Sequence, residues 1–142
     1  MTEMRAARDR LERAGDLPSV LEAAHEVFAV ALTALRACED PASVWFGRFV
    51  MAAASAADGR DALIFAPSMP GQRTHVTRGT GEDSSAGTAD TVAGDIASLC
   101  GLAAVRLAQA AGQAADPGDQ AACVRAARCT RRICELLAEG GT

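Results

Sequence analysis

Five cysteines are the residues best suited to metal or redox chemistry in this chain of 142 residues: Cys38, Cys100, Cys123, Cys129 and Cys134. No two of them form a C-x-x-C pair, and no spacing is typical of a zinc site. On a helix, Cys123 and Cys134 share a face but lie about 16 Å apart along the axis, with Cys129 to one side. We therefore predict reduced thiols that pack in the core. A soft-metal or redox role that also uses Cys38 or Cys100 is the alternative.

His25 is the first of two histidines, with Glu22 one helical turn earlier and Glu26 directly after it. Carboxylate and imidazole at this spacing can pair as an acid–base couple or supply half of a metal site. Di-metal bundles provide a second such motif from another helix, and this chain has none. We therefore predict a histidine at the boundary between the apolar and polar faces of its helix.

The second histidine, His75, lies in a polar stretch, SMPGQRTHVTRGTGEDSSAG, that covers residues 68–87. Two arginines and two threonines flank it, and such a loop can bind an anionic ligand or close over one. A solvated connection is the alternative. The candidate ligand-binding residues are Arg73, His75, Arg78, His25 and Trp45.

No sequence motif for nucleotide binding or acyl transfer is present. GxxxxGK[ST], GxGxxG and GxSxG are all absent, and we predict neither a cofactor nor a metal. A net charge of −4, a pI of about 5.1 and the lack of tyrosine argue against a nucleic-acid partner. Near the C-terminus, an arginine face could hold an acidic partner or phosphates, but its spacing is typical of a solvent-facing stripe. It consists of Arg125, Arg128, Arg131 and Arg132, diluted by Glu135 and Glu139.

Helical periodicity and capping residues predict five helices, over about residues 2–14, 18–38, 41–57, 89–112 and 117–138. Asp40 and Pro41 mark the start of the third helix, and Asp58-Gly59 marks its end. Short turns join the second helix to the third and the fourth to the fifth, so each pair should form an αα-hairpin. The fold class predicted is all-α, a four-helix bundle with an additional N-terminal helix.

A single domain is expected at this length. It comprises an N-terminal helix (1–15), a first hairpin (17–57), a crossover (58–88) and a second hairpin (89–139). The crossover is long for a compact domain. Its segments DALIFAP and RTHVTR are β-prone and could pair as a small β-hairpin, and a short helix over residues 60–65 is the alternative.

The 89–112 helix has an apolar core face and, beside it, a face of small residues only. Glycine in a helix interior costs about 1 kcal/mol relative to alanine, and close approach of another backbone can offset this cost. The neighbour could belong to this chain or to a second copy. We predict a homodimer through this face or through the first helix, and the crossover would also permit exchange of hairpins. The packing face consists of Gly94, Ala97, Gly101, Ala104 and Ala108.

The N-terminal residues are charged and lack the apolar core of a signal peptide. The longest uncharged stretch of the fourth helix, from Asp95 to Arg106, is shorter than the about 20 residues that span a bilayer. We therefore expect a cytoplasmic protein without a membrane partner. Because no catalytic constellation is found, the function expected is that of a non-enzymatic interaction or regulatory protein, such as an adaptor or accessory subunit. The alternatives are a small-molecule binder or small enzyme with an inter-helix pocket closed by residues 68–87, and a cysteine-based metal or redox protein.

Overall fold

The computed structural model describes residues 2–70 and 88–138. It contains α1 (Thr2–Arg13), α2 (Leu17–Ala37), α3 (Phe46–Ile64), α4 (Ala89–Gln113) and α5 (Pro117–Ala138). No strand occurs in these two ranges. The all-α fold predicted from the sequence is confirmed.

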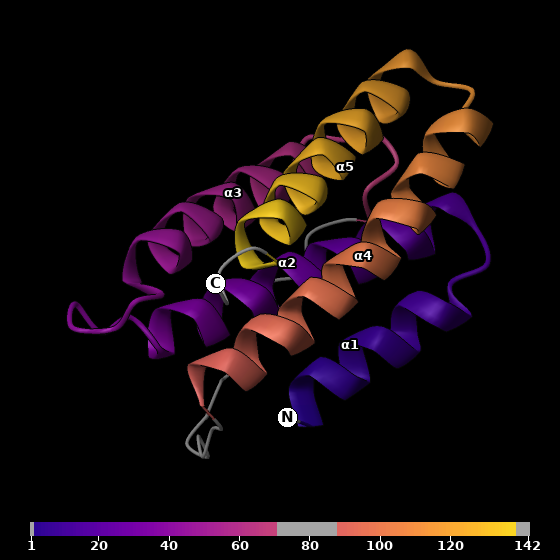
Figure 1. Ribbon diagram of the computed structural model, residues 1–142. Coiled ribbons are helices and arrows are strands. Elements are labelled where there is room, and N and C mark those ends of the chain that lie inside the picture. Colours follow the sequence, from indigo (N-terminus) through magenta and orange to yellow (C-terminus); the bar gives the residue numbers. More distant parts are fainter. Residues whose placement is uncertain (1, 71–87, 139–142) are drawn as a thin grey trace.

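Four of the helices form a closed bundle. In order around it, α2 packs against α3, α3 against α5, α5 against α4, and α4 against α2. The helix α1 lies along α2 and α4 of the same chain (Figure 1). The two predicted hairpins, α2–α3 and α4–α5, and the additional N-terminal helix are therefore all present.

One hydrophobic core unites the five helices. Its largest fully buried side chains come from each of them and include Leu11, Phe28, Phe49, Leu99, Leu107 and Ile133. Of the predicted core face of α4, Val92, Ile96, Leu99, Cys100, Ala103, Leu107 and Ala110 are all buried. Burial of this many apolar side chains, rather than helix propensity, is what stabilises the arrangement.

Side-chain caps set the boundaries of three helices. The Asp16 carboxylate accepts a hydrogen bond from the Ser19 N–H (3.0 Å) at the start of α2. Bonds from the Ser19 side chain and backbone hold the pKa of Asp16 below its usual value. Thr88 caps α4 by accepting from the Thr91 N–H (3.1 Å), and Asp116 accepts from the Gly118 N–H (2.7 Å) before α5. Such caps satisfy amides that have no partner within the helix.

The predicted start of α3 is wrong by five residues, because a turn precedes the helix. Asp40 accepts from the Ala42 N–H (3.0 Å), and Ser43 Oγ accepts from the Trp45 N–H (3.0 Å). These bonds fold residues 40–45 as a turn, and the helix begins only at Phe46. The Asp-Pro pair therefore initiates the turn instead of the helix.

The predicted end of α3 is also wrong, because the helix runs through Asp58 and Gly59 to Ile64. Gly59 is buried where the ring of Phe28 crosses α3, and a Cβ built on it would lie 2.3 Å from Phe28 Cζ. The glycine therefore permits close contact between α2 and α3 and does not end the helix. Continued burial beyond it, at Leu63, extends the helix.

The first of the two segments considered for a β-hairpin in the crossover, DALIFAP, does not form a strand. Residues 61–64 of DALIFAP belong to α3, in line with the helical alternative, and turns follow up to Pro70. The crossover therefore begins at Phe65 and not at residue 58. The second segment, RTHVTR, lies outside the described residues.

Arginines attach helix ends to their neighbours. Arg106 on α4 donates to the carbonyl of Ala14 at the end of α1, and Arg48 on α3 donates to the carbonyl of Leu136 near the end of α5 (3.3 Å). A cation at a helix C-terminus satisfies a free carbonyl and interacts favourably with the helix dipole. Arg10 of α1 also pairs with Glu26 of α2 at 2.5 Å.

Candidate functional site

The five candidate ligand-binding residues are not all placed by the structure. Arg73, His75 and Arg78 lie outside the described residues. Trp45 immediately precedes the first residue of α3. His25 lies near the other end of α3, because the charges of Arg60 and Asp61, in the last two turns of that helix, act on the pKa of its imidazole. Because α3 rises 1.5 Å per residue, the two ends lie roughly 20 Å apart. His25 and Trp45 therefore do not line one pocket.

Trp45 is a core residue with a specific tertiary contact. Its side chain is buried, its ring lies 5.3 Å from that of Phe49 in a tilted arrangement, and its Nε1–H donates to Asp90 Oδ1 (2.6 Å). A buried indole needs such an acceptor. The hydrogen bond joins the α2–α3 turn to the first turn of α4, which is a structural role.

His25 lies on α2 at the boundary of the core, where it is partly buried. Burial lowers the pKa of its imidazole, and the positive charge of Arg60 adds to this effect, while Asp61 and Glu22 oppose it. Glu26, the other predicted neighbour, pairs with Arg10 instead. Among the described residues, no group of three His, Cys, Asp or Glu side chains could hold a metal ion.

The first residues of the 68–87 stretch are fastened to the start of α5. Ser68 donates to the buried Asp119 carboxylate twice, from its backbone N–H (2.8 Å) and from its hydroxyl (2.6 Å). Beside this pair, a Cβ on Gly118 would lie 2.9 Å from Pro67, so the two segments are in close contact. Sequence reasoning missed Asp119, whose only signal is its position in the first turn of a helix.

The cysteines behave as core residues in the described part of the chain. Cys100 and Cys123 are fully buried, and the other three are partly buried. Burial raises the pKa of all five thiols, that of Cys123 to about 11. Thiols in this state are poor nucleophiles, because the thiolate is the reactive form.

Alkaline pH is expected to destabilise the protein through these thiols. A thiol whose folded pKa is raised stabilises the fold fully below its unfolded pKa, near 9, and loses that contribution as pH rises towards the folded value. For Cys100 and Cys123 together, the free energy of unfolding should fall by about 2 kcal/mol between pH 8 and pH 10. Urea denaturation with a reductant present measures it.

The measurement reports on the cysteine thiols, because the chain has no lysine and no tyrosine side chains that would titrate in the same pH range. The control is the Cys100→Ala, Cys123→Ala double variant, in which the decrease between pH 8 and pH 10 should be clearly smaller. An equally steep decrease in the double variant would show that these thiols do not cause it.

Most of the small-residue face of α4 is turned away from the core, but Ala97 packs against the core and its carbonyl accepts a hydrogen bond from the Cys134 thiol of α5 (3.4 Å). Gly94 and Ala108 are exposed, and Ala97, Gly101 and Ala104 are partly exposed. A Cβ built on Gly94 or Gly101 would meet no atom within 4 Å. No described helix of the same chain therefore approaches these two glycines closely, and Val105 beside them is 54% exposed.

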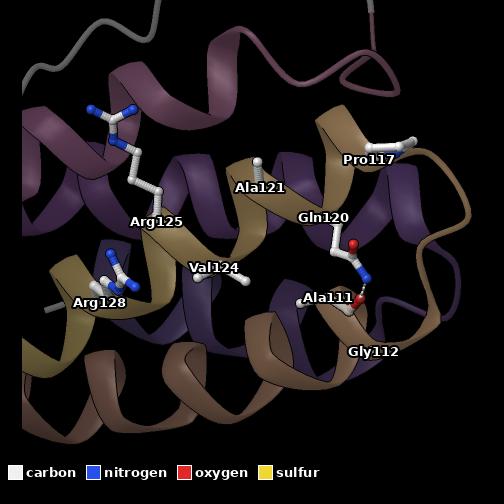
Figure 2. Close-up of a pocket in the computed structure, with 8 residues that line it drawn as sticks. All are labelled: Ala111, Gly112, Pro117, Gln120, Ala121, Val124, Arg125 and Arg128. Atoms are coloured by element: carbon white, nitrogen blue, oxygen red, sulfur yellow. Dashed lines mark hydrogen bonds between the residues drawn. The ribbon is translucent and has the colours of Figure 1, made fainter.

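A shallow groove of about 740 Å³ lies over the end of α4 and the first half of α5 (Figure 2). Its polar margin is formed by Arg125 and Arg128, which are both exposed. The Gln120 side chain on α5 donates a hydrogen bond to the Ala111 carbonyl on α4 (3.2 Å). Val124 on α5 points towards α4, whereas Arg125 extends to the side of α3 (Figure 2). The remaining lining residues are small or apolar: Ala111, Gly112, Pro117 and Ala121.

The arginine face predicted on α5 is exposed in the structure. Arg125, Arg128, Arg131 and Arg132 all face solvent. The two ion pairs within 4 Å among the described residues are Arg10–Glu26 and Arg60–Asp61, so neither involves this face. The α5 surface is therefore a basic strip on a protein of net charge −4.

A smaller recess of about 250 Å³ lies where the α1–α2 turn meets the end of α4. Arg106, Gln109 and Gln113 form its α4 side, and Gly15 and Asp16 form part of the other side. Arg106 Nε is buried without a hydrogen-bond partner in the described part of the chain. The guanidinium is already bound to the Ala14 carbonyl, so its main role is to fasten α1.

Two helices, α2 and α4, are long and apolar enough to cross a membrane by length and composition alone. Core helices of soluble bundles have the same properties, and 44% and 39% of the two most apolar windows are buried within the molecule. The predictions of a cytoplasmic location and of no membrane partner stay predictions.

Searches of protein-family models, curated proteins and solved structures found no match to this chain.

Proposed function

We propose that this protein is a non-enzymatic interaction protein that self-associates through the outward face of α4. The observation that carries the proposal is the position of Gly94 and Gly101, which lie in the interior of a 25-residue helix with open space in front of them. Each glycine costs about 1 kcal/mol of helix stability relative to alanine. A second backbone packed against this face would offset that cost.

Two features support this face over the first helix as the contact. Met4, Ala7 and Leu11 of α1 are buried against the chain's own bundle, so α1 has little apolar surface left to offer. Along α4, by contrast, Val105 is 54% exposed next to Gly101. An isologous contact between two copies of α4 would cover this valine and the small residues together.

The Gly101→Leu variant tests the proposal. The native chain should scatter light as a particle of twice its 14.6 kDa mass, and the leucine should convert it to a monomer because it prevents close helix approach. The substitution also removes a helix-interior glycine, so the monomer should remain folded.

Gly47→Leu is the matched control, since Gly47 is an exposed helical glycine of α3 with open space around it. It should leave the particle mass unchanged. A native protein that is monomeric at high concentration, or a Gly101→Leu variant that keeps the native mass, would rule out this face as the contact.

A further inference from the structure

We propose that the outer surface of α5, together with the adjoining end of α4, is a docking site for an acidic amphipathic helix of a partner protein. The surface consists of the arginines Arg125 and Arg128 together with the apolar and small residues of the adjoining groove, above all Val124, Ala121 and Gly112. This proposal extends the interaction role proposed above by naming a partner, and it uses different residues from the α4 contact.

Charge complementarity argues for an acidic occupant. Arg125 and Arg128 are exposed and have no carboxylate within 4 Å among the described residues. Arg131 and Arg132 continue the same strip, with the exposed Glu135 as the carboxylate among its described residues, so the strip is basic although the chain as a whole carries a charge of −4. A positive strip of this kind attracts acidic segments and disfavours basic ones.

The apolar part of the surface argues for a helix and against a polyanion. Val124 is 40% exposed and faces α4, and a Cβ built on Gly112 would meet no atom within 4 Å. An amphipathic helix can place apolar side chains in this groove and carboxylates beside the arginines. Nucleic acid would leave the valine without a partner, and the negative net charge repels it.

Spacing fits a helix as well. Arg125 and Arg128 are one helical turn apart, about 4.5 Å along the axis of α5. Carboxylates three or four residues apart on a partner helix are separated by about 4.5–6 Å. A helix along α5 can therefore reach both arginines once the exposed Arg125 side chain, which extends to the side of α3, turns towards the groove. The groove extends from Pro117 to Arg128, which matches roughly three turns of such a helix.

The experiment uses a fluorescent helical peptide of about 16 residues, with leucines on one face and glutamate pairs four residues apart beside it. Fluorescence anisotropy with the full chain should show saturable binding. A second peptide, with glutamine in place of every glutamate, should bind at least tenfold more weakly. Arg125→Gln and Arg128→Gln should each weaken binding of the acidic peptide about fivefold.

Two further variants distinguish binding in the groove from a general effect of the protein's charge. Arg36→Gln removes the same charge from an exposed position in the last turn of α2 and should leave the affinity unchanged. Gly112→Leu fills the groove without removing charge and should weaken binding at least fivefold. The titration is repeated with the Gly101→Leu variant. Binding of the acidic peptide to this variant shows whether docking depends on self-association, so that the two proposals can fail separately.

Several outcomes would overturn the proposal. They are equal binding of the glutamate and glutamine peptides, an Arg36→Gln effect as large as that of Arg128→Gln, or an unchanged affinity in Gly112→Leu. Tighter binding of a single-stranded oligonucleotide, or of phosphatidylglycerol vesicles, with the same dependence on Arg125 and Arg128 would likewise overturn it and would assign the strip to a polyanion or to a membrane.

Discussion

The Gly59→Ala variant should be less stable than the native protein by about 2 kcal/mol in free energy of unfolding, although alanine is the better helix former. The added Cβ would lie 2.3 Å from Cζ and 2.4 Å from Cε1 of Phe28. The Phe28 ring is fully buried and cannot move away without displacing its own neighbours in a close-packed core. Urea denaturation, followed by circular dichroism, measures the loss.

Two comparisons identify the cause. Gly47→Ala, in the same helix but with open space around it, should leave stability unchanged or raise it by up to about 1 kcal/mol. In the Phe28→Leu background, Gly59→Ala should cost much less, which gives a coupling energy between the two positions. Equal losses at Gly59 in both backgrounds would mean that the contact with the ring is not the reason.

Asp119→Ala should cost about 3 kcal/mol of stability. The substitution removes the acceptor of both Ser68 hydrogen bonds, and a hydrogen bond to a charged group contributes about 1.5–3 kcal/mol. It also removes a negative charge from the first turn of α5, where the helix dipole favours one. Chemical denaturation gives the total, and hydrogen exchange of the Ser68 amide reports on the contact itself.

Graded variants make the Asp119 prediction specific. Ser68→Ala removes one of the two bonds and should cost roughly half as much. Asp119→Asn retains an acceptor for the Ser68 N–H and should also cost less than the alanine. Asp95→Ala, at an exposed position of α4, should change stability by less than about 0.5 kcal/mol. If Asp119→Ala leaves both stability and Ser68 exchange unaltered, the contact does not hold the segment.

Helix number and pairing were predictable from the sequence because they depend on local and periodic signals. The repeat of apolar residues identified the core face of α4 correctly, and the predicted starts of the fourth and fifth helices, at residues 89 and 117, are those of α4 and α5. Short connections between α2 and α3 and between α4 and α5 left antiparallel hairpins as the simple solution. These features require no knowledge of distant residues.

The candidate site was less predictable, because single residue types have different roles in different surroundings. Trp45 was named as a candidate ligand-binding residue from its type alone, and only the structure shows that its indole is buried and bonded to Asp90, 45 positions away in the sequence. The groove combines residues from the end of α4 and the start of α5, on both sides of the turn that joins them. Its signal in the sequence is Val124, an apolar residue on the polar face of α5. The arginine face was recognised, but its lack of ion pairs with described residues required coordinates.

The sequence by itself therefore determined the all-helical class, the two hairpins and the identity of most core residues, since these follow from periodicity, caps and turn lengths. Tertiary structure decided the limits of α3, the burial of Asp119 and the exposure of the small-residue face of α4. The physical reason is the same in each case. Whether a glycine ends a helix, admits an aromatic ring as Gly59 does, or faces solvent as Gly94 does depends on what lies opposite it, and that neighbour is set by packing between helices distant in sequence.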